Sequence, residues 1–174
     1  MYLKYRKNFY SQNGEDGIIE KNIEDLKLDK KKLSVCEFGA VDGKLFSNTF
    51  NLVEKFRAKA LLIEGDKEKF KLLIKTAKKH KTITPVERFV SPTGINSLDQ
   101  ILLENNFPIN FDVLSIDIDG YDLEIWENLK NYFPKIVIIE INSSILPGIY
   151  QTHCPEKKQQ GNSFSSILSL ANKN

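Results

Sequence analysis

The 174-residue chain has few cysteines, no long hydrophobic run and little net charge, and each shortage excludes a class of protein. Its two cysteines, Cys36 and Cys154, are too few for a disulfide scaffold and too isolated for a zinc site. No run of about 18 apolar residues is present, so we expect no membrane span. Basic residues number 25 and acidic residues 23, a balance that argues against a nucleic-acid partner.

The first residues also lack the apolar run that a secretory signal peptide needs. Lys4, Arg6 and Lys7 place positive charges where that run would lie. Together with the low cysteine content, which fits a reducing compartment, this predicts a cytoplasmic protein.

Short apolar runs alternate with amphipathic segments along the chain, and this alternation predicts an α/β fold. The runs cover residues 33–38, 60–64, 83–89, 111–117 and 136–141. Most are nearly continuous in apolar residues, as in strands covered on both faces, whereas Pro85 marks the third as an edge strand. Helical spacing of apolar residues follows near 18–26, 70–77, 98–102 and 123–129. We expect a doubly wound, mostly parallel sheet.

The length is that of one domain, which we divide into three parts. Residues 1–30 form an N-terminal helical cap and residues 31–145 the core of the domain. Residues 146–174 form a C-terminal loop and a capped helix.

Acidic residues stand at or near the carboxyl ends of four of the five predicted strands. They are Glu37, Glu64, Asp117 and Glu140. The ligand crevice of a doubly wound sheet lies outside those ends, and charge is costly to bury without a partner. Any one of these carboxylates also fits a structural role such as capping the next helix, but the four together predict a polar site.

The turn after the first strand contains glycines without forming a dinucleotide-binding loop. Gly39 and Gly43 lie in the segment 37–43, which does not match G-x-G-x-x-G, so a pyrophosphate site is poorly supported. Glu64 follows Gly43 by 21 residues, at the end of the second strand. An acidic residue there accepts hydrogen bonds from ribose hydroxyls, so the pattern predicts a ribose.

These motifs resemble those of the class I S-adenosylmethionine-dependent methyltransferases, and more closely their FkbM-like branch. The matching stretches are Ser11-Gln12-Asn13-Gly14-Glu15-Asp16-Gly17, residues 37–43 with Ser47-Asn48-Thr49, Ile63-Glu64-Gly65-Asp66, residues 115–122, and Ile139-Glu140-Ile141-Asn142. Val41 departs from the pattern, because many class I enzymes have a second glycine there. The resemblance implies a Rossmann-like fold, S-adenosylmethionine as cofactor and O-methylation of a small molecule or glycan, such as a surface polysaccharide precursor.

The resemblance also implies roles for single residues. Glu37 and Gly39 would border the methionine and ribose of the cofactor, and Glu64 with Gly65 would hold the ribose. Ser47, Asn48 and Thr49, where the first crossover helix begins, would bind the cofactor carboxylate. Ser91 would flank the adenine, and Gln12 would close over the crevice as part of a lid.

For the chemical step we select Asp117, Asp119 and His153. Asp117 also counts among the cofactor-binding residues, and either aspartate would take the proton of the acceptor hydroxyl or orient the acceptor. His153 follows the fifth strand and is an alternative base, although a lone loop histidine also fits a surface role. We predict no metal site, while Asp117, Glu140 and Asn142 form an all-oxygen set that leaves Mg²⁺ as an alternative.

The predicted strands stop one hairpin short of a full class I sheet, which has two more. The fifth strand would then be an unpaired apolar edge, so we expect the C-terminal segment, a partner chain or a second copy to cover it. A truncated sequence explains the same pattern.

A cofactor-binding or scaffold subunit that needs a partner for activity is therefore the alternative function. A nicotinamide-dependent oxidoreductase is disfavoured by the missing glycine motif.

Overall fold

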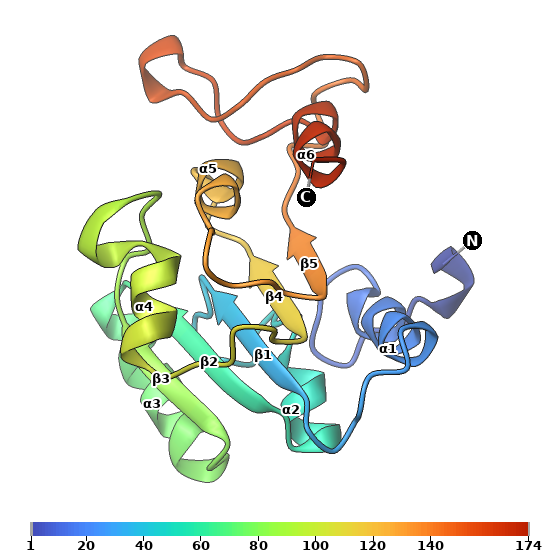
Figure 1. The fold of residues 1–174 in the computed structure, drawn as a ribbon, viewed down its shortest axis with the longest axis vertical. Helices are drawn as coiled ribbons and strands as arrows, with labels where there is room; N and C mark the ends of the chain where they lie inside the picture. Colours follow the sequence, from blue (N-terminus) through green and yellow to red (C-terminus); the bar gives the residue numbers. More distant parts are fainter. Residues whose placement is uncertain (1, 174) are drawn as a thin grey trace.

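The computed structural model describes residues 2–173, and its centre is a five-stranded, wholly parallel sheet with helices on both faces (Figure 1). The strands are β1 (Ser34–Phe38), β2 (Lys59–Glu64), β3 (Ile83–Glu87), β4 (Val113–Ile116) and β5 (Ile136–Ile139). Their order in the sheet is β3-β2-β1-β4-β5. The predicted doubly wound α/β fold is confirmed, and the order reverses between β1 and β4, where such sheets have their ligand crevice.

The strands differ in burial according to their place in the sheet. All five residues of β1, in the centre, are buried, as expected for a strand covered on both faces. The outer strand β3 is largely half-buried or exposed and contains Pro85, as predicted for an edge strand. Residues of β5 are all half-buried.

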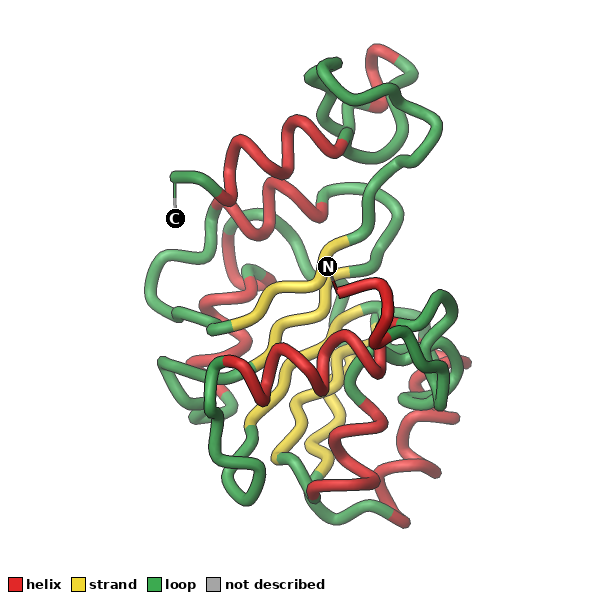
Figure 2. The backbone as a smooth tube through the Cα atoms, turned by 90° about the vertical axis from the view of Figure 1, so that its right-hand side faces the viewer, coloured by secondary structure: helices red, strands yellow, loops and turns green. Residues whose placement is uncertain are grey.

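One face of the sheet is covered by α1 (Glu15–Asp25), α2 (Phe50–Phe56) and α3 (Lys67–Lys79). Their side chains Ile19, Ile23, Phe50 and Leu73 pack in one cluster with Val35 and Leu62 of the sheet. Figure 2 shows α1 lying across the strands. The other face is covered by α4 (Leu98–Glu104) and α5 (Asp122–Glu127), which pack on Phe38 and Leu114.

Side chains cap several of these helices as their residue types favour. Asp66 accepts hydrogen bonds from two backbone N–H groups at the start of α3, and the Ser97 side chain accepts one at the start of α4. Short 3₁₀ helices lie at Tyr2–Tyr5, Gly94–Asn96 and Pro155–Lys157. Among the described residues, none of the helices combines the length and hydropathy that crossing a membrane requires.

After β5 the chain forms a long loop and returns as α6 (Phe164–Ala171) beside α5 (Figure 1). Ile167 and Leu170 of α6 pack on Leu123, with Ile139 of β5 against the same cluster. This contact covers a side chain of β5 and leaves its backbone edge unpaired, since no strand within residues 2–173 lies on its outer side. Met1 and Asn174, the ends of the predicted domain, lie outside the described residues.

Candidate functional site

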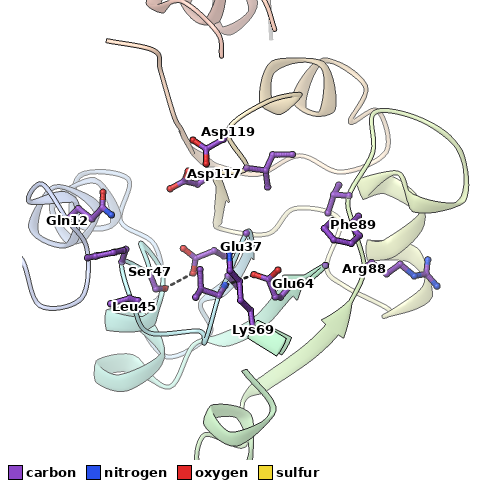
Figure 3. Close-up of a pocket in the computed structure, with 17 residues that line it drawn as sticks. Gln12, Glu37, Leu45, Ser47, Glu64, Lys69, Arg88, Phe89, Asp117 and Asp119 are labelled. Atoms are coloured by element: carbon purple, nitrogen blue, oxygen red, sulfur yellow. Dashed lines mark hydrogen bonds between the residues drawn. The ribbon is translucent and has the colours of Figure 1, made fainter. Parts of the chain in front are cut away.

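A cavity of about 370 Å³ lies at the carboxyl ends of the central strands (Figure 3). Its walls come from the segment before α1 and from the loops after β1, β2, β3 and β4. The lining residues are Gln12, Glu37, Gly39, Ala40, Val41, Leu45, Phe46, Ser47, Glu64, Gly65, Lys69, Arg88, Phe89, Val90, Asp117, Ile118 and Asp119. Glu37 and Glu64 therefore face one common hollow.

Glu37, at the end of β1, is held by the residues that precede α2. Its carboxylate accepts hydrogen bonds from the Ser47 hydroxyl (2.5 Å), the Thr49 hydroxyl (2.7 Å) and the backbone N–H of Asn48 (2.9 Å). Burial raises the pKa of this carboxyl group, which is only 5% exposed, and the hydrogen bonds partly oppose the shift.

This network gives Ser47, Asn48 and Thr49 a different partner from the predicted one. Their donors point to the Glu37 carboxylate, and the Asn48 side chain donates to the Ser115 hydroxyl at 3.1 Å. Ser47 lines the cavity, whereas Thr49 is fully buried behind it. In this structure the three residues thus orient Glu37, and their predicted contact with a cofactor carboxylate stays a prediction.

Glu64, at the end of β2, joins the loops after β1 and β2. Its carboxylate accepts from the backbone N–H groups of Val41 and Asp66, both at 2.8 Å, and it is 6% exposed. Each oxygen uses one lone pair in these bonds, so each has a second one for a ligand hydroxyl.

Two glycines of the site make close contacts with neighbouring loops. A Cβ atom on Gly39 (φ +76°) would lie 2.0 Å from the carbonyl oxygen of Asp117, so the turn after β1 passes directly beside the end of β4. A Cβ atom on Gly65 would lie 2.3 Å from the Phe89 ring. The absence of a side chain at Gly65 thus lets an aromatic ring lie against the cavity wall.

Backbone strain is present in the walls of this cavity. Val41 (φ +51°) and Phe46 (φ +60°) line it in the left-handed conformation, which β-branched and bulky residues rarely adopt. Asp119 (φ +57°) has the same conformation, which aspartate adopts more readily. Such strain persists where the surroundings fix the backbone, and it is frequent at functional sites. Val41 stands where the resembling family has glycine, and its N–H is held by Glu64.

The rim over β4 and β5 is strongly acidic. Desolvation, reinforced by the neighbouring charges of Asp119 and Asp122, raises the pKa of Asp117 to about 6. Desolvation, followed by the charges of Asp117 and Asp119, raises the pKa of Glu140 to about 7. The carboxylates of the rim therefore resist being ionised all at once, and a positively charged ligand would stabilise their ionised forms.

Two further cavities adjoin this rim. One of about 390 Å³ shares Gln12, Phe46 and Asp117 with the main cavity and is also lined by Glu15 and Glu140. The other, of about 220 Å³, is lined by residues of three segments: Asp119, Asp122, Glu140, Ile141, Asn142, Ser143, Gln160, Gly161 and Asn162.

The structure brings most of the predicted residues together but leaves some outside the main cavity. Asn48 lines the 390 Å³ cavity, and Ser91 forms an isolated bridge with Ser97 away from the lining. His153 packs edge-on against Tyr121, with 4.8 Å between the ring centroids, and its Nδ1 accepts from the Gly161 N–H. His153 therefore lies beside the turn after β4 and is not among the residues that line the main cavity.

The oxygen set of the magnesium alternative, Asp117, Glu140 and Asn142, includes an amide that is engaged within the protein. Within residues 2–173, no group of three or more histidine, cysteine, aspartate or glutamate side chains is arranged to hold a metal ion. The Asn142 amide oxygen accepts from the N–H and hydroxyl of Ser144, which occupies the atom that a cation would need.

Sequence reasoning missed several residues of the site. Arg88 directly follows β3, so the same strand-end rule would have found it. Lys69 is one of several lysines in α3, and the sequence pattern does not distinguish it from the others as a residue of the site. Asp122 and Asn162 reach the 220 Å³ cavity only through tertiary structure.

Solved structures with a similar fold include a protein with SAH bound and a candidate methyltransferase. The N-terminal domain of EvdMO1, solved with SAH bound, matches with a TM-score of 0.54 over 91% of this chain and 70% of that chain, at 12% identity. A candidate sarcosine dimethylglycine methyltransferase from Galdieria sulphuraria matches with a TM-score of 0.57 over 91% and 59% of the two chains, at 15% identity. The chain thus has the Rossmann-like fold of class I methyltransferases.

The chain spans only part of the matched proteins. It covers half of TrmK from M. capricolum, solved in complex with S-adenosyl-homocysteine, at 20% identity and a TM-score of 0.43. Comparison of the sequence with protein-family models and with curated proteins finds no match.

Proposed function

We propose that this chain is an S-adenosylmethionine-dependent methyltransferase that binds its cofactor in the main cavity. The observation that carries the proposal is the convergence of Glu37, Glu64 and Asp117, from three adjacent strands, on one hollow at the switch point of the sheet. Structures of the same fold hold S-adenosylhomocysteine, the product of the same cofactor.

The lining suggests how the cofactor lies. Glu64 accepts hydrogen bonds from the ribose hydroxyls through its free lone pairs, and the exposed Phe89 ring beside Gly65 offers a face for the adenine. Asp117 and Glu37 lie toward the methionine end, and Gln12 covers the cavity from the segment before α1. S-adenosylmethionine supplies a methyl group on a positively charged sulfur, which the acidic rim attracts.

We propose further that the acceptor is a hydroxyl group of a small molecule or glycan, bound in the 390 Å³ cavity beside Asp117. As the bond between the acceptor oxygen and the methyl carbon forms, the bond from that carbon to sulfur breaks, and the hydroxyl proton passes to a carboxylate. Asp117 and Glu140, with pKa values of about 6 and 7, are suited to take this proton near neutral pH. The glycan acceptor and the FkbM-like branch rest on the sequence motifs.

The cofactor assignment is tested by isothermal titration of the chain with S-adenosylmethionine and S-adenosylhomocysteine, with a nicotinamide dinucleotide as the control ligand. Saturable binding of both adenosyl compounds, without binding of the dinucleotide, is expected. Failure of both to bind at about 1 mM would remove the proposal.

A second candidate function is a cofactor-binding subunit that needs a partner chain. The outer edge of β5, which no strand within residues 2–173 pairs with, favours it. Turnover of any hydroxyl acceptor by the isolated chain excludes this function. For either function we propose a cytoplasmic location, on the grounds of the low cysteine content.

A further inference from the structure

The turn at residues 117–122, after β4, carries Asp117 and Asp119 and is held from inside by Asp122. This side chain is 2% exposed, and its two oxygens accept from the N–H groups of Ile118 (2.9 Å) and Gly120 (2.8 Å). Asp119 lies between these two anchored residues with a left-handed φ of +57°. Aspartate tolerates this conformation better than most residues, and the two hydrogen bonds hold the backbone on either side of it.

A second anchor reaches the same turn from the C-terminal segment. The Asn162 side chain, 42 residues away along the chain, donates from Nδ2 to the carbonyl oxygen of Gly120 at 2.9 Å. Its Oδ1 accepts from the His153 N–H at 3.0 Å, and its own carbonyl oxygen accepts from the Asn142 N–H at 2.8 Å. Asn162 is 2% exposed, so these bonds lack competition from water.

Asn162 therefore connects three separate segments at one point. They are the turn after β4, the residues after β5 and the loop around His153. Asn162 and Asp119 line the same 220 Å³ cavity, and Asp119 also lines the main one. Since Asp122 holds the N–H of Gly120 and Asn162 its carbonyl oxygen, both polar groups of this buried residue have partners.

We propose that Asn162 is a positioning residue, which fixes the 117–122 turn and so sets Asp117 and Asp119 at the wall shared by the cavities. The role in methyl transfer rests on the proposed function, whereas the anchoring of the turn does not. The C-terminal segment is then a part of the site as well as a cover for α5 and β5.

The variants Asn162→Ala and Asn162→Asp test this role. Alanine removes both side-chain bonds, whereas aspartate keeps an acceptor for His153 and removes the donor to Gly120. Ser163→Ala is the matched control, because Ser163 caps α6 in the same segment without contacting the turn. Amide hydrogen exchange of Ile118 and Gly120, followed by NMR, reports on the turn, and titration with S-adenosylhomocysteine reports on the site.

We expect both Asn162 variants to speed exchange at Gly120 by about tenfold or more and to weaken S-adenosylhomocysteine binding by about tenfold. Ser163→Ala should lower Tm and leave both readings unchanged. Unchanged exchange in the Asn162 variants, or an equal increase in Ser163→Ala, would overturn the proposal. If the unmodified chain does not bind S-adenosylhomocysteine, the proposed function fails while the exchange data still decide whether Asn162 anchors the turn.

Discussion

At the scale of single residues, the carboxylates of the site fall into two kinds. Glu37 and Glu64 are buried and surrounded by backbone and hydroxyl donors, so their positions are fixed before any ligand arrives. Asp117 and Glu140 lie at the rim, where the charges of neighbouring carboxylates add to desolvation in raising their pKa values. The first kind suits the holding of neutral hydroxyls, and the second suits the attraction of a cation or the uptake of a proton.

Replacing Glu64 tests the first kind. Glu64→Gln keeps the size of the side chain but removes the charge that strengthens hydrogen bonds from ribose hydroxyls. Its amide nitrogen also cannot accept from the N–H group of Val41 or Asp66. Such bonds contribute about 1.5–3 kcal/mol each, so we expect roughly tenfold to 100-fold weaker binding of S-adenosylhomocysteine by isothermal titration.

Glu87→Gln is the matched control for this prediction. Glu87 lies opposite Glu64 in the register of β2 and β3 but is exposed and does not line the cavity. Binding by this variant should equal that of the unmodified chain. Equal binding by the Glu64 variant would show that the ribose lies elsewhere.

The pH dependence of binding tests the second kind of carboxylate. The pKa values of Asp117 and Glu140 are higher in the folded chain than in the unfolded chain, so protonation of these two groups favours the folded state. This contribution is complete below about pH 4 and is lost as pH rises through about 6 to 7. Over the same range the rim becomes negative. S-adenosylmethionine carries a sulfonium charge that S-adenosylhomocysteine lacks, so its affinity relative to the product should rise from pH 5 to pH 8.

The ratio of the two affinities, measured by titration at each pH, isolates the sulfonium charge because the rest of the ligand is shared. Asp117→Asn removes one titrating group and should flatten the dependence. A ratio that does not change with pH in the unmodified chain would contradict the placement of the sulfonium near this rim.

The sequence predicted these acidic residues but not their partners. Strand ends and residue types marked Glu37, Glu64 and Asp117, because parallel strands bring their carboxyl ends to one edge. It assigned Ser47 and Thr49 to a cofactor, whereas the structure points their hydroxyls at Glu37. Which donor meets which acceptor depends on side-chain positions that spacing along the chain does not encode.

At the scale of elements, the contact between the turn after β1 and the end of β4 shapes the cavity. Gly39→Ala places a Cβ atom within 2.0 Å of the Asp117 carbonyl oxygen, in addition to the cost of a left-handed alanine. Gly94 has a similar φ of +82° with no atom within 4 Å of its Cβ position, so Gly94→Ala carries the conformational cost alone.

We expect Gly39→Ala to lower the free energy of unfolding by about 1–3 kcal/mol more than Gly94→Ala does, because backbone must shift to admit the methyl group. Urea denaturation of the two variants measures this difference. Equal losses would mean that the turn and β4 separate easily.

Element boundaries followed the apolar runs only in part. The runs at 111–117 and 136–141 become the shorter strands Val113–Ile116 and Ile136–Ile139. Phe111 is fully buried before β4 begins, so apolar character continues where the ladder of hydrogen bonds does not. Burial and strand pairing are separate properties, and the sequence pattern reports mainly the first.

At the scale of the whole molecule, the outer edge of β5 is a surface on which a strand of another chain could pair. Ile136 and Glu140 direct their N–H groups toward β4, so the N–H groups of the alternate residues Val137 and Ile139 point outward. Within residues 2–173 no strand accepts them. We propose that a second copy of the chain pairs along this edge, since exposed edges favour pairing with another strand.

Val137→Pro tests this association, because proline removes an outward N–H without removing a bond to β4. We expect a dimer in light scattering of the unmodified chain at high concentration and a monomer for the variant. Val137→Ala, which keeps the N–H, should remain dimeric. A monomeric unmodified chain, or a dimeric proline variant, would contradict pairing through β5.

The sequence by itself determined the sheet, its edge strand and the acidic rim, because apolar periodicity and parallel strand ends follow from local chemistry. Tertiary structure alone decided that Asn162 meets Gly120, that His153 packs on Tyr121 beside the main cavity, and that α6 packs on α5 while the edge of β5 stays unpaired. These contacts join segments far apart in the chain, and they depend on how a long loop folds back, which no repeating pattern of residues records.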